Sequence, residues 1–150
     1  MELKDGIFLV GEADYPRVVE VWEASVRATH HFVAESDIQF FRPIVSEVLP
    51  KLDVFCMRDS EGLVVGYVAV ADKEVQMLFI HPDYRGQGVG RKLLIYAIEQ
   101  LGANRLSVNE QNEQAVGFYK RMGLEVVGRS ELDGFGKPYP LLHMRVVDNL

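Results

Sequence analysis

The feature that most limits the fold of this chain lies at residues 74–92, where a short apolar run leads through a glycine-rich turn into a helical pattern. Gly86, Gly88 and Gly90 occupy alternate positions of that turn. Alternate glycines let successive backbone N–H groups face one point, and the following helix adds unpaired N–H groups and the positive end of its dipole. The segment therefore predicts a cradle for a phosphate or pyrophosphate group. The alternative is a tight turn that only allows a helix to pack closely on a strand.

The glycine spacing separates this turn from two other anion-binding loops. A dinucleotide-binding fingerprint needs a further glycine three positions after Gly88, and Arg91 stands there. A nucleotide-hydrolysing loop needs Gly-Lys followed by Ser or Thr, whereas Gly136 and Lys137 are followed by Pro138. Neither loop is predicted.

The composition describes an acidic chain of the size of one domain. With 150 residues, we expect a single domain over residues 1–150. Lys and Arg number 16 against 22 Asp and Glu, and the net charge of −6 argues against a nucleic-acid partner. The turn is a local exception, because Arg85, Arg91 and Lys92 outweigh Asp83 there. A basic island of this kind suits a small anionic ligand.

Several classes of protein are disfavoured by what the sequence lacks. The longest apolar run, residues 62–71, is half of the roughly 20 residues that a membrane span needs. The charged start has no apolar run behind it, so we expect a cytoplasmic protein with no membrane partner. Cys56 is the single cysteine in the sequence, so no intrachain disulfide can form. Its place in an alternating pattern predicts a buried residue of a strand. His30 and His31 point about 100° apart on a helix, and no metal site is predicted.

Hydrophobic periodicity places helices and strands along most of the chain. Helical spacing is expected for residues 14–29, 36–49, 88–101 and 112–122, with Pro43 indicating a break in the second of these. Alternating or β-branched runs predict strands at residues 7–10, 52–58, 63–71, 74–80, 106–108, 124–127 and 141–146. The three strands before the glycine turn read as an antiparallel meander, so the fold class is α+β with a mixed sheet.

Two motifs together resemble the GNAT superfamily of N-acetyltransferases. Arg85-x-x-Gly88-x-Gly90 after a strand resembles its acetyl-CoA-binding motif. Residues 112–124 resemble its later pattern Asn-x-x-Ala-x-x-Phe-Tyr-x-x-x-Gly-Phe, with Leu124 in place of the final Phe. The resemblance covers nearly the whole chain, and residues 22–32 and 128–144 are similar to a bacterial subgroup, the YjaB-type acetyltransferases.

The resemblance implies the GNAT, or acyl-CoA N-acyltransferase, fold. In that fold a mostly antiparallel central sheet carries helices on both faces. Its fourth and fifth strands, here residues 74–80 and 106–108, splay apart and leave backbone groups unpaired.

The same resemblance implies how acetyl-CoA would bind. The backbone in the strand at residues 74–80 would pair with the pantetheine arm as an added strand does, and the glycine turn would hold the pyrophosphate. Asn112 would cap a helix and also touch the arm. The residues so assigned are Leu78, Phe79, Ile80, Arg85, Gly86, Gln87, Gly88, Val89, Gly90, Arg91 and Asn112.

The implied activity is direct transfer of the acetyl group to a primary amine of a small molecule or a protein lysine, in a ternary complex. An amine with a pKa of about 10.4 is almost fully protonated at neutral pH, so it needs a base. Glu74 resembles the base of the histone-acetyltransferase branch; a solvated strand-end charge is its plainer interpretation, and Glu110, Glu113 and ordered water are alternatives. Tyr119 would protonate the departing thiolate, although an aromatic residue at this helical spacing is otherwise core.

The acceptor side is the least defined part of the interpretation. By resemblance it lies between the first two helices and the C-terminal hairpin. Its wall would come from Trp22, Thr29, His30, Phe32 and Tyr139, with Asp133 and Lys137 nearby. A non-catalytic sensor or regulatory module that binds acyl-CoA is the alternative function. A homodimer is a reasonable default, and the acceptor itself is not predicted.

Overall fold

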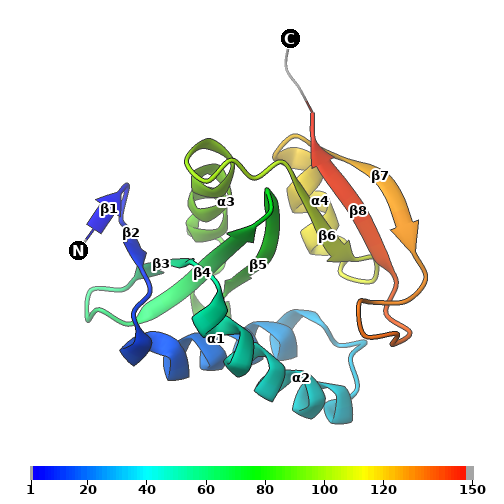
Figure 1. Ribbon diagram of the computed structural model, residues 1–150, viewed down its shortest axis with the longest axis horizontal. Coiled ribbons are helices and arrows are strands. Elements are labelled where there is room, and N and C mark those ends of the chain that lie inside the picture. The colour runs from blue at the N-terminus through cyan, green and yellow to red at the C-terminus, as the bar shows by residue number, and fades with distance from the viewer. Residues whose placement is uncertain (1, 148–150) are drawn as a thin grey trace.

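Eight strands form one mixed sheet in the computed structural model, which describes residues 2–147 (Figure 1). The order across the sheet is β1-β2-β3-β4-β5-β6-β8-β7, and only the β5–β6 pair is parallel. The predicted α+β fold with a mostly antiparallel sheet is confirmed. The strands are β1 (Glu2–Lys4), β2 (Ile7–Leu9), β3 (Val54–Arg58), β4 (Val64–Ala71), β5 (Glu74–Ile80), β6 (Arg105–Asn109), β7 (Leu124–Ser130) and β8 (Leu141–Val146).

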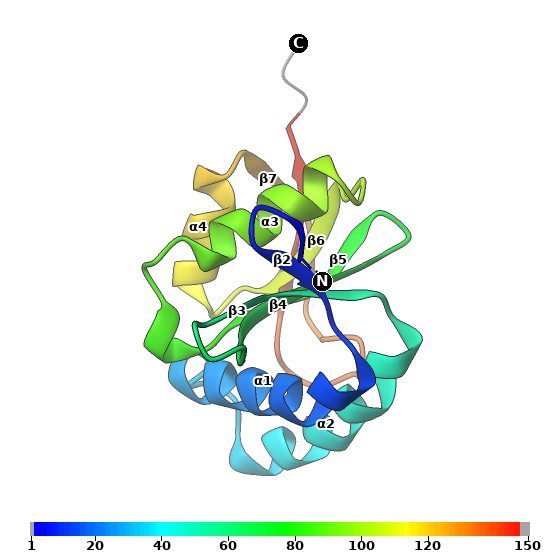
Figure 2. The ribbon, with the colours of Figure 1, turned by 90° about the vertical axis from the view of Figure 1, so that its left-hand side faces the viewer.

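Two pairs of helices cover opposite faces of the sheet, as Figure 2 shows from the side. The helices α1 (Tyr15–Thr29) and α2 (Glu35–Val48) enclose one apolar core, and α3 (Val89–Glu99) and α4 (Glu113–Arg121) enclose the other. This arrangement confirms the prediction of helices on both faces. Of the helices in residues 2–147, none combines the length and the apolar content needed to cross a bilayer.

The predicted break at Pro43 is wrong, because α2 continues through it. Proline removes the N–H group that would bond to the carbonyl of Gln39, four residues earlier. Pro43 and Gln39 are both exposed, so water can solvate that carbonyl. The short strand β1 was not predicted either, since its three residues are all exposed and carry no apolar alternation.

The neighbours of β5 differ on its two sides. It pairs with β4 along its whole length, with one irregularity of register between Ala69 and Val70. Its parallel pairing with β6 joins Glu74 to Arg105 and Val75 to Leu106, and the register of the two strands extends no further. The rest of β5 therefore borders a space rather than a neighbouring strand, at the place where the sequence predicts a splay.

Gly66 on β4 allows the start of α3 to approach the sheet closely. A Cβ atom at this position would lie 2.8 Å from both Cδ1 of Ile80 and Cγ1 of Val89. Real Cβ atoms essentially never come so close, so a larger residue here would force the Ile80 and Val89 side chains to shift. Sequence reasoning missed this residue, because a lone glycine in a strand pattern carries no sign of which helix packs over it.

Candidate active site

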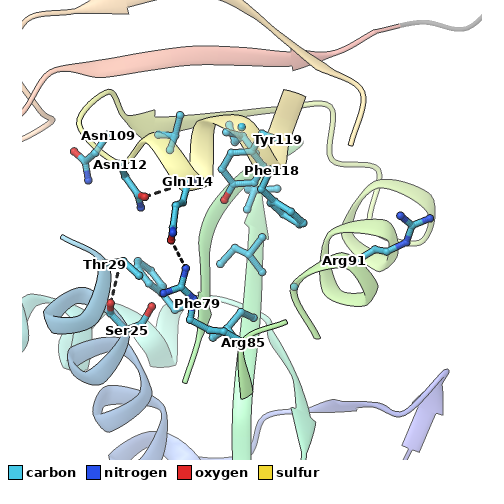
Figure 3. Close-up of a pocket in the computed structure, with 18 of the residues that line it drawn as sticks. Ser25, Thr29, Phe79, Arg85, Arg91, Asn109, Asn112, Gln114, Phe118 and Tyr119 are labelled. Atoms are coloured by element: carbon cyan, nitrogen blue, oxygen red, sulfur yellow. Dashed lines mark hydrogen bonds between the residues drawn. The ribbon is translucent and has the colours of Figure 1, made fainter. Parts of the chain in front are cut away.

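A cavity of about 590 Å³ lies between the unpaired part of β5, the strand β6, the starts of α3 and α4, and the end of α1 (Figure 3). Of the positions assigned to acetyl-CoA, Gln87 does not line it. The other ten do, namely Leu78, Phe79, Ile80, Arg85, Gly86, Gly88, Val89, Gly90, Arg91 and Asn112. Tyr119, Thr29 and His30 also line it. The structure thus brings together the two sequence motifs and the end of the first helix.

The glycine turn presents a row of free backbone donors. Gly86 and Gly88 have φ angles of 77° and 83°, in the left-handed region that favours glycine. Within residues 2–147, the structure gives no hydrogen-bond acceptor to the six consecutive N–H groups from Gly86 to Arg91. The next N–H group, that of Lys92, is the first to be paired, with the carbonyl of Gly88 at 3.0 Å. Unpaired N–H groups at a helix start form a site for an anion.

The main chain of β5 faces two ways. The N–H of His81 donates to the carbonyl of Val65 at 2.8 Å, which fixes the alternation of the antiparallel ladder. By this alternation the main-chain groups of Phe79 face β4, whereas those of Leu78 and Ile80 face the cavity. The assignment of the Phe79 backbone to a ligand therefore needs correction, since β4 occupies those groups.

Two arginines of the turn point in different directions in Figure 3. Nη2 of Arg85 donates a hydrogen bond to Oε1 of Gln114 on α4, so this side chain reaches across the cavity. The side chain of Arg91 extends away from the cavity on the exposed side of α3. Arg85 thus places its charge at the cavity, and Arg91 contributes through its backbone N–H.

Tyr119 brings a phenol hydroxyl to the cavity. Its side chain belongs to the apolar core beside Phe118, yet it also lines the cavity. The structure gives its hydroxyl no hydrogen-bond partner among residues 2–147, and the oxygen is accessible from the cavity rather than sealed in the core. Burial raises the pKa of Tyr119 to about 12, so the phenol keeps its proton at neutral pH.

Asn112 holds the start of α4 at the cavity. Its Oδ1 accepts a hydrogen bond from the N–H of Ala115 at 3.2 Å, as expected of a helix cap. The cap uses the side-chain oxygen and leaves the amide NH₂ group available to a ligand. The double role implied for Asn112 is therefore sterically compatible with the structure.

The end of α1 brings a histidine to the opposite side of the cavity. Oγ1 of Thr29 donates to the carbonyl of Ser25 at 2.7 Å and lies 2.7 Å from Nδ1 of His30. The His30 ring packs against Phe32, with ring centroids 5.2 Å apart. Burial, together with the neighbouring His31, lowers the pKa of His30 to about 4, so its imidazole is neutral at pH 7.

Glu74 lies outside this cavity. It borders a second cleft of about 570 Å³, which shares Leu106 and Ser107 with the first. Oε1 of Glu74 is 3.9 Å from Nε of Arg105 across the paired end of β5 and β6. The expected base therefore sits where the two strands meet, not where they separate.

Three residues assigned to the acceptor wall do not line the cavity. Trp22 is 5% exposed and packs in the core under α1. Phe32 contacts the rings of His30 and Tyr139. The Tyr139 hydroxyl donates to Asp37 and accepts from the N–H of Ala34, so it joins the β7–β8 loop to the start of α2. Helical or loop position alone does not show which way such side chains turn.

Comparison with known proteins identifies the family. The family model described as "Acetyltransferase (GNAT) domain" matches residues 45–145. This chain belongs to the GNAT acetyltransferase family. It is 42% identical over 130 residues to the peptidyl-lysine N-acetyltransferase YjaB of Escherichia coli, covering 87% of this chain and 88% of that protein. It is 41% identical over 128 residues to the protein of the same name in Salmonella typhimurium, covering 85% and 88%.

A solved structure agrees with this family. The solution structure of the apo form of YjaB from Escherichia coli superimposes with a TM-score of 0.88 at 38% identity, over 95% of this chain and 97% of that one. The prediction of a GNAT fold and of an N-acetyltransferase enzyme is confirmed. GNAT acetyltransferases use acetyl-CoA as their acetyl donor.

Proposed function

We propose that this GNAT enzyme transfers the acetyl group of acetyl-CoA directly to the side-chain amine of a lysine in a peptide or protein. The observation that supports acetyl-CoA as the donor is the row of six unpaired N–H groups from Gly86 to Arg91. This row lies at the same cavity as the unpaired part of β5. Lysine as the acceptor is supported by the two relatives above, whose names specify peptidyl-lysine.

The residues present fit a CoA thioester. A Cβ atom at Gly86 or Gly88 would meet nothing within 4 Å, so the turn is open to a diphosphate. Arg85 adds a cation beside the N–H row, and the main-chain groups of Leu78 and Ile80 offer the pantetheine amides a strand-like partner. When bound, acetyl-CoA supplies the activated acyl group.

Tyr119 is proposed to donate the proton that the departing sulfur needs. Burial raises its pKa to about 12, above that of an ordinary thiol near 8.5. Burial in the core raises the pKa of the Cys56 thiol to about 11, the direction expected when a thiolate loses water. A thiolate released against the Tyr119 side chain would lose part of its water in the same way, which raises its pKa toward that of the phenol and favours the proton transfer.

Direct transfer, without an acetylated enzyme, is also part of the proposal. Cys56 is completely buried on β3 and does not line the cavity. Its raised pKa further disfavours the thiolate that nucleophilic catalysis would require. The acceptor amine therefore attacks the thioester itself.

The test is an assay with acetyl-CoA and two groups of acceptors, lysine-containing peptides and small amines such as polyamines. Thiol release and the acceptor mass are followed together. We expect amine-dependent release of CoA with one acetyl group added to a lysine side chain. Acetyl-CoA binding without release would contradict transfer and favour the sensor function. Acetylation of small amines alone would contradict the lysine acceptor.

Two sequence predictions, a homodimer and a cytoplasmic location, stay untested by the fold. Light scattering of the purified protein measures the first directly. A monomeric mass at assay concentration would contradict it.

A further inference from the structure

Loss of a proton from the acceptor amine needs a base in the cavity. Among the described residues that line it, only His30 and Glu113 have side chains with a basic atom that can serve as a proton acceptor. Glu113 is exposed at the first position of α4. His30 is partly buried on the opposite side, at the end of α1.

The contacts of His30 determine which ring nitrogen carries the proton. The hydroxyl of Thr29 has a single proton, and the carbonyl of Ser25 can only accept a hydrogen bond. Both 2.7 Å contacts of Oγ1 are hydrogen bonds only if Nδ1 of His30 is the donor to Thr29. Neutral His30 then carries its lone pair on Nε2, for which the structure gives no partner within residues 2–147.

We propose that Nε2 of His30 accepts the proton that the amine loses as the amide bond forms, with Thr29 and the Ser25 carbonyl holding the ring in the required tautomer. The inference rests on the acetyl transfer proposed above and names its base. It replaces Glu74, which borders the other cleft. Catalytic histidines are commonly oriented in this way, because a hydrogen-bond partner on Nδ1 determines that Nε2 is the nitrogen with the free lone pair.

The proton and bond changes balance with the groups in the cavity. The lysine ammonium first gives one proton to solvent water. The neutral amine nitrogen then bonds to the thioester carbonyl carbon, and the proton that it loses as the amide forms passes to Nε2 of His30. The carbon–sulfur bond breaks, and the sulfur takes the proton of Tyr119. His30 then returns its proton through water to the Tyr119 phenolate, so both residues regain their starting state.

The neutral form of His30 suits this role. Because its pKa is about 4 in the free protein, the imidazole does not repel an incoming cationic amine by its own charge. It is a weak base toward a free ammonium group, so it acts after the neutral amine has bonded to carbon, when the protons left on that nitrogen are more acidic. The hydrogen bond from Nδ1 to Thr29 is kept when the ring is protonated, since both nitrogens then donate.

The experiment compares His30→Ala with His31→Ala, its exposed neighbour, using acetyl-CoA and a lysine peptide that the wild-type enzyme acetylates. We expect His30→Ala to lower kcat by about 10² to 10⁴, with unchanged acetyl-CoA affinity and melting temperature. Added imidazole should restore part of the lost turnover. His31→Ala should keep wild-type turnover, and Thr29→Val should lower kcat less than His30→Ala does.

Several results would overturn the proposal. The first is a turnover of His30→Ala within about twofold of wild type, and the second is an increase in the KM of that variant with no change in kcat. The third is a His30→Ala variant that does not respond to imidazole, combined with loss of turnover in Glu113→Gln. If His30→Ala does not fold, His30→Gln is measured in its place under the same criteria. Failure of the wild-type enzyme to acetylate any lysine peptide would instead refute the proposed function.

Discussion

Nη2 of Arg85 donates a hydrogen bond to Oε1 of Gln114, which joins the glycine turn before α3 to the first turn of α4. Both residues line the cavity, and they are 29 positions apart in the sequence, one in each of the two motifs. The contact therefore links the proposed pyrophosphate cradle to the helix that carries Tyr119. It also keeps a guanidinium group beside the unpaired N–H row of the turn.

This pair gives a prediction for donor affinity. Arg85→Ala removes a cation and a charge-assisted hydrogen bond from the cradle, and we expect the Kd of acetyl-CoA to rise about tenfold or more. Gln114→Ala leaves the arginine in place and should change the Kd much less. Calorimetry at two salt concentrations measures both, and the Arg85 effect should shrink at the higher one. Equal Kd values for the two variants would contradict the assignment of Arg85 to the pyrophosphate.

Tyr119→Phe isolates the phenol from the rest of the side chain. The ring still fills the core, so we expect acetyl-CoA affinity and stability to stay near those of wild type. Turnover should fall by about 10² to 10⁴, since only the proton donor is lost. Steady-state kinetics measure this, with Tyr96→Phe on α3, outside the cavity, as the matched control. Unchanged turnover would remove Tyr119 from the mechanism.

Glu74→Gln is expected to have little effect on turnover. Glu74 borders the second cleft and lies 3.9 Å from Arg105, an ion pair at the surface worth about 0 to 1 kcal/mol. The variant should keep kcat within about threefold of wild type over the pH range of the assay, because the side chain of residue 74 does not reach the reacting atoms. A loss of a hundredfold or more, with an altered pH profile, would restore Glu74 as the base.

Tyr67 provides a prediction for stability. Its hydroxyl is fully buried on β4 and has no hydrogen-bond partner among the described residues. An unsatisfied buried hydroxyl costs free energy, so Tyr67→Phe should raise the free energy of unfolding by about 1 kcal/mol. Tyr84→Phe removes the bond from its hydroxyl to Asp59 and should not raise it. Urea denaturation compares the two, and a less stable Tyr67→Phe would show that the hydroxyl has a partner, such as a buried water.

The parts of the structure that follow from local sequence could be predicted well. The strand at residues 74–80 has the bounds of β5, and Asn112 caps α4 as expected, because alternation and capping act over a few residues. Both motifs also reached the same cavity. These predictions needed only the order and spacing of neighbouring residues.

The direction of individual side chains could not be obtained in that way. The family resemblance assigns Trp22 and Tyr139 to the acceptor wall, yet Trp22 lies in a core and Tyr139 binds Asp37. Phe79 occupies the expected strand, but the register with β4 turns its backbone groups away from the cavity. Each of these outcomes depends on a partner distant in sequence. The same holds for Gly66, where a Cβ atom would displace the side chains of Ile80 and Val89.

The central claim is that the N–H row from Gly86 to Arg91 holds the diphosphate of acetyl-CoA. The most direct measurement is an amide NMR titration of the ¹⁵N-labelled protein with acetyl-CoA, repeated on Gly88→Val, whose side chain is strained at a φ of 83°. We expect the largest shifts at residues 86–91, with further shifts at Leu78 and Ile80, and a strongly weakened titration in the variant. Shifts confined to residues outside this cavity, or unchanged affinity in Gly88→Val, would contradict the account.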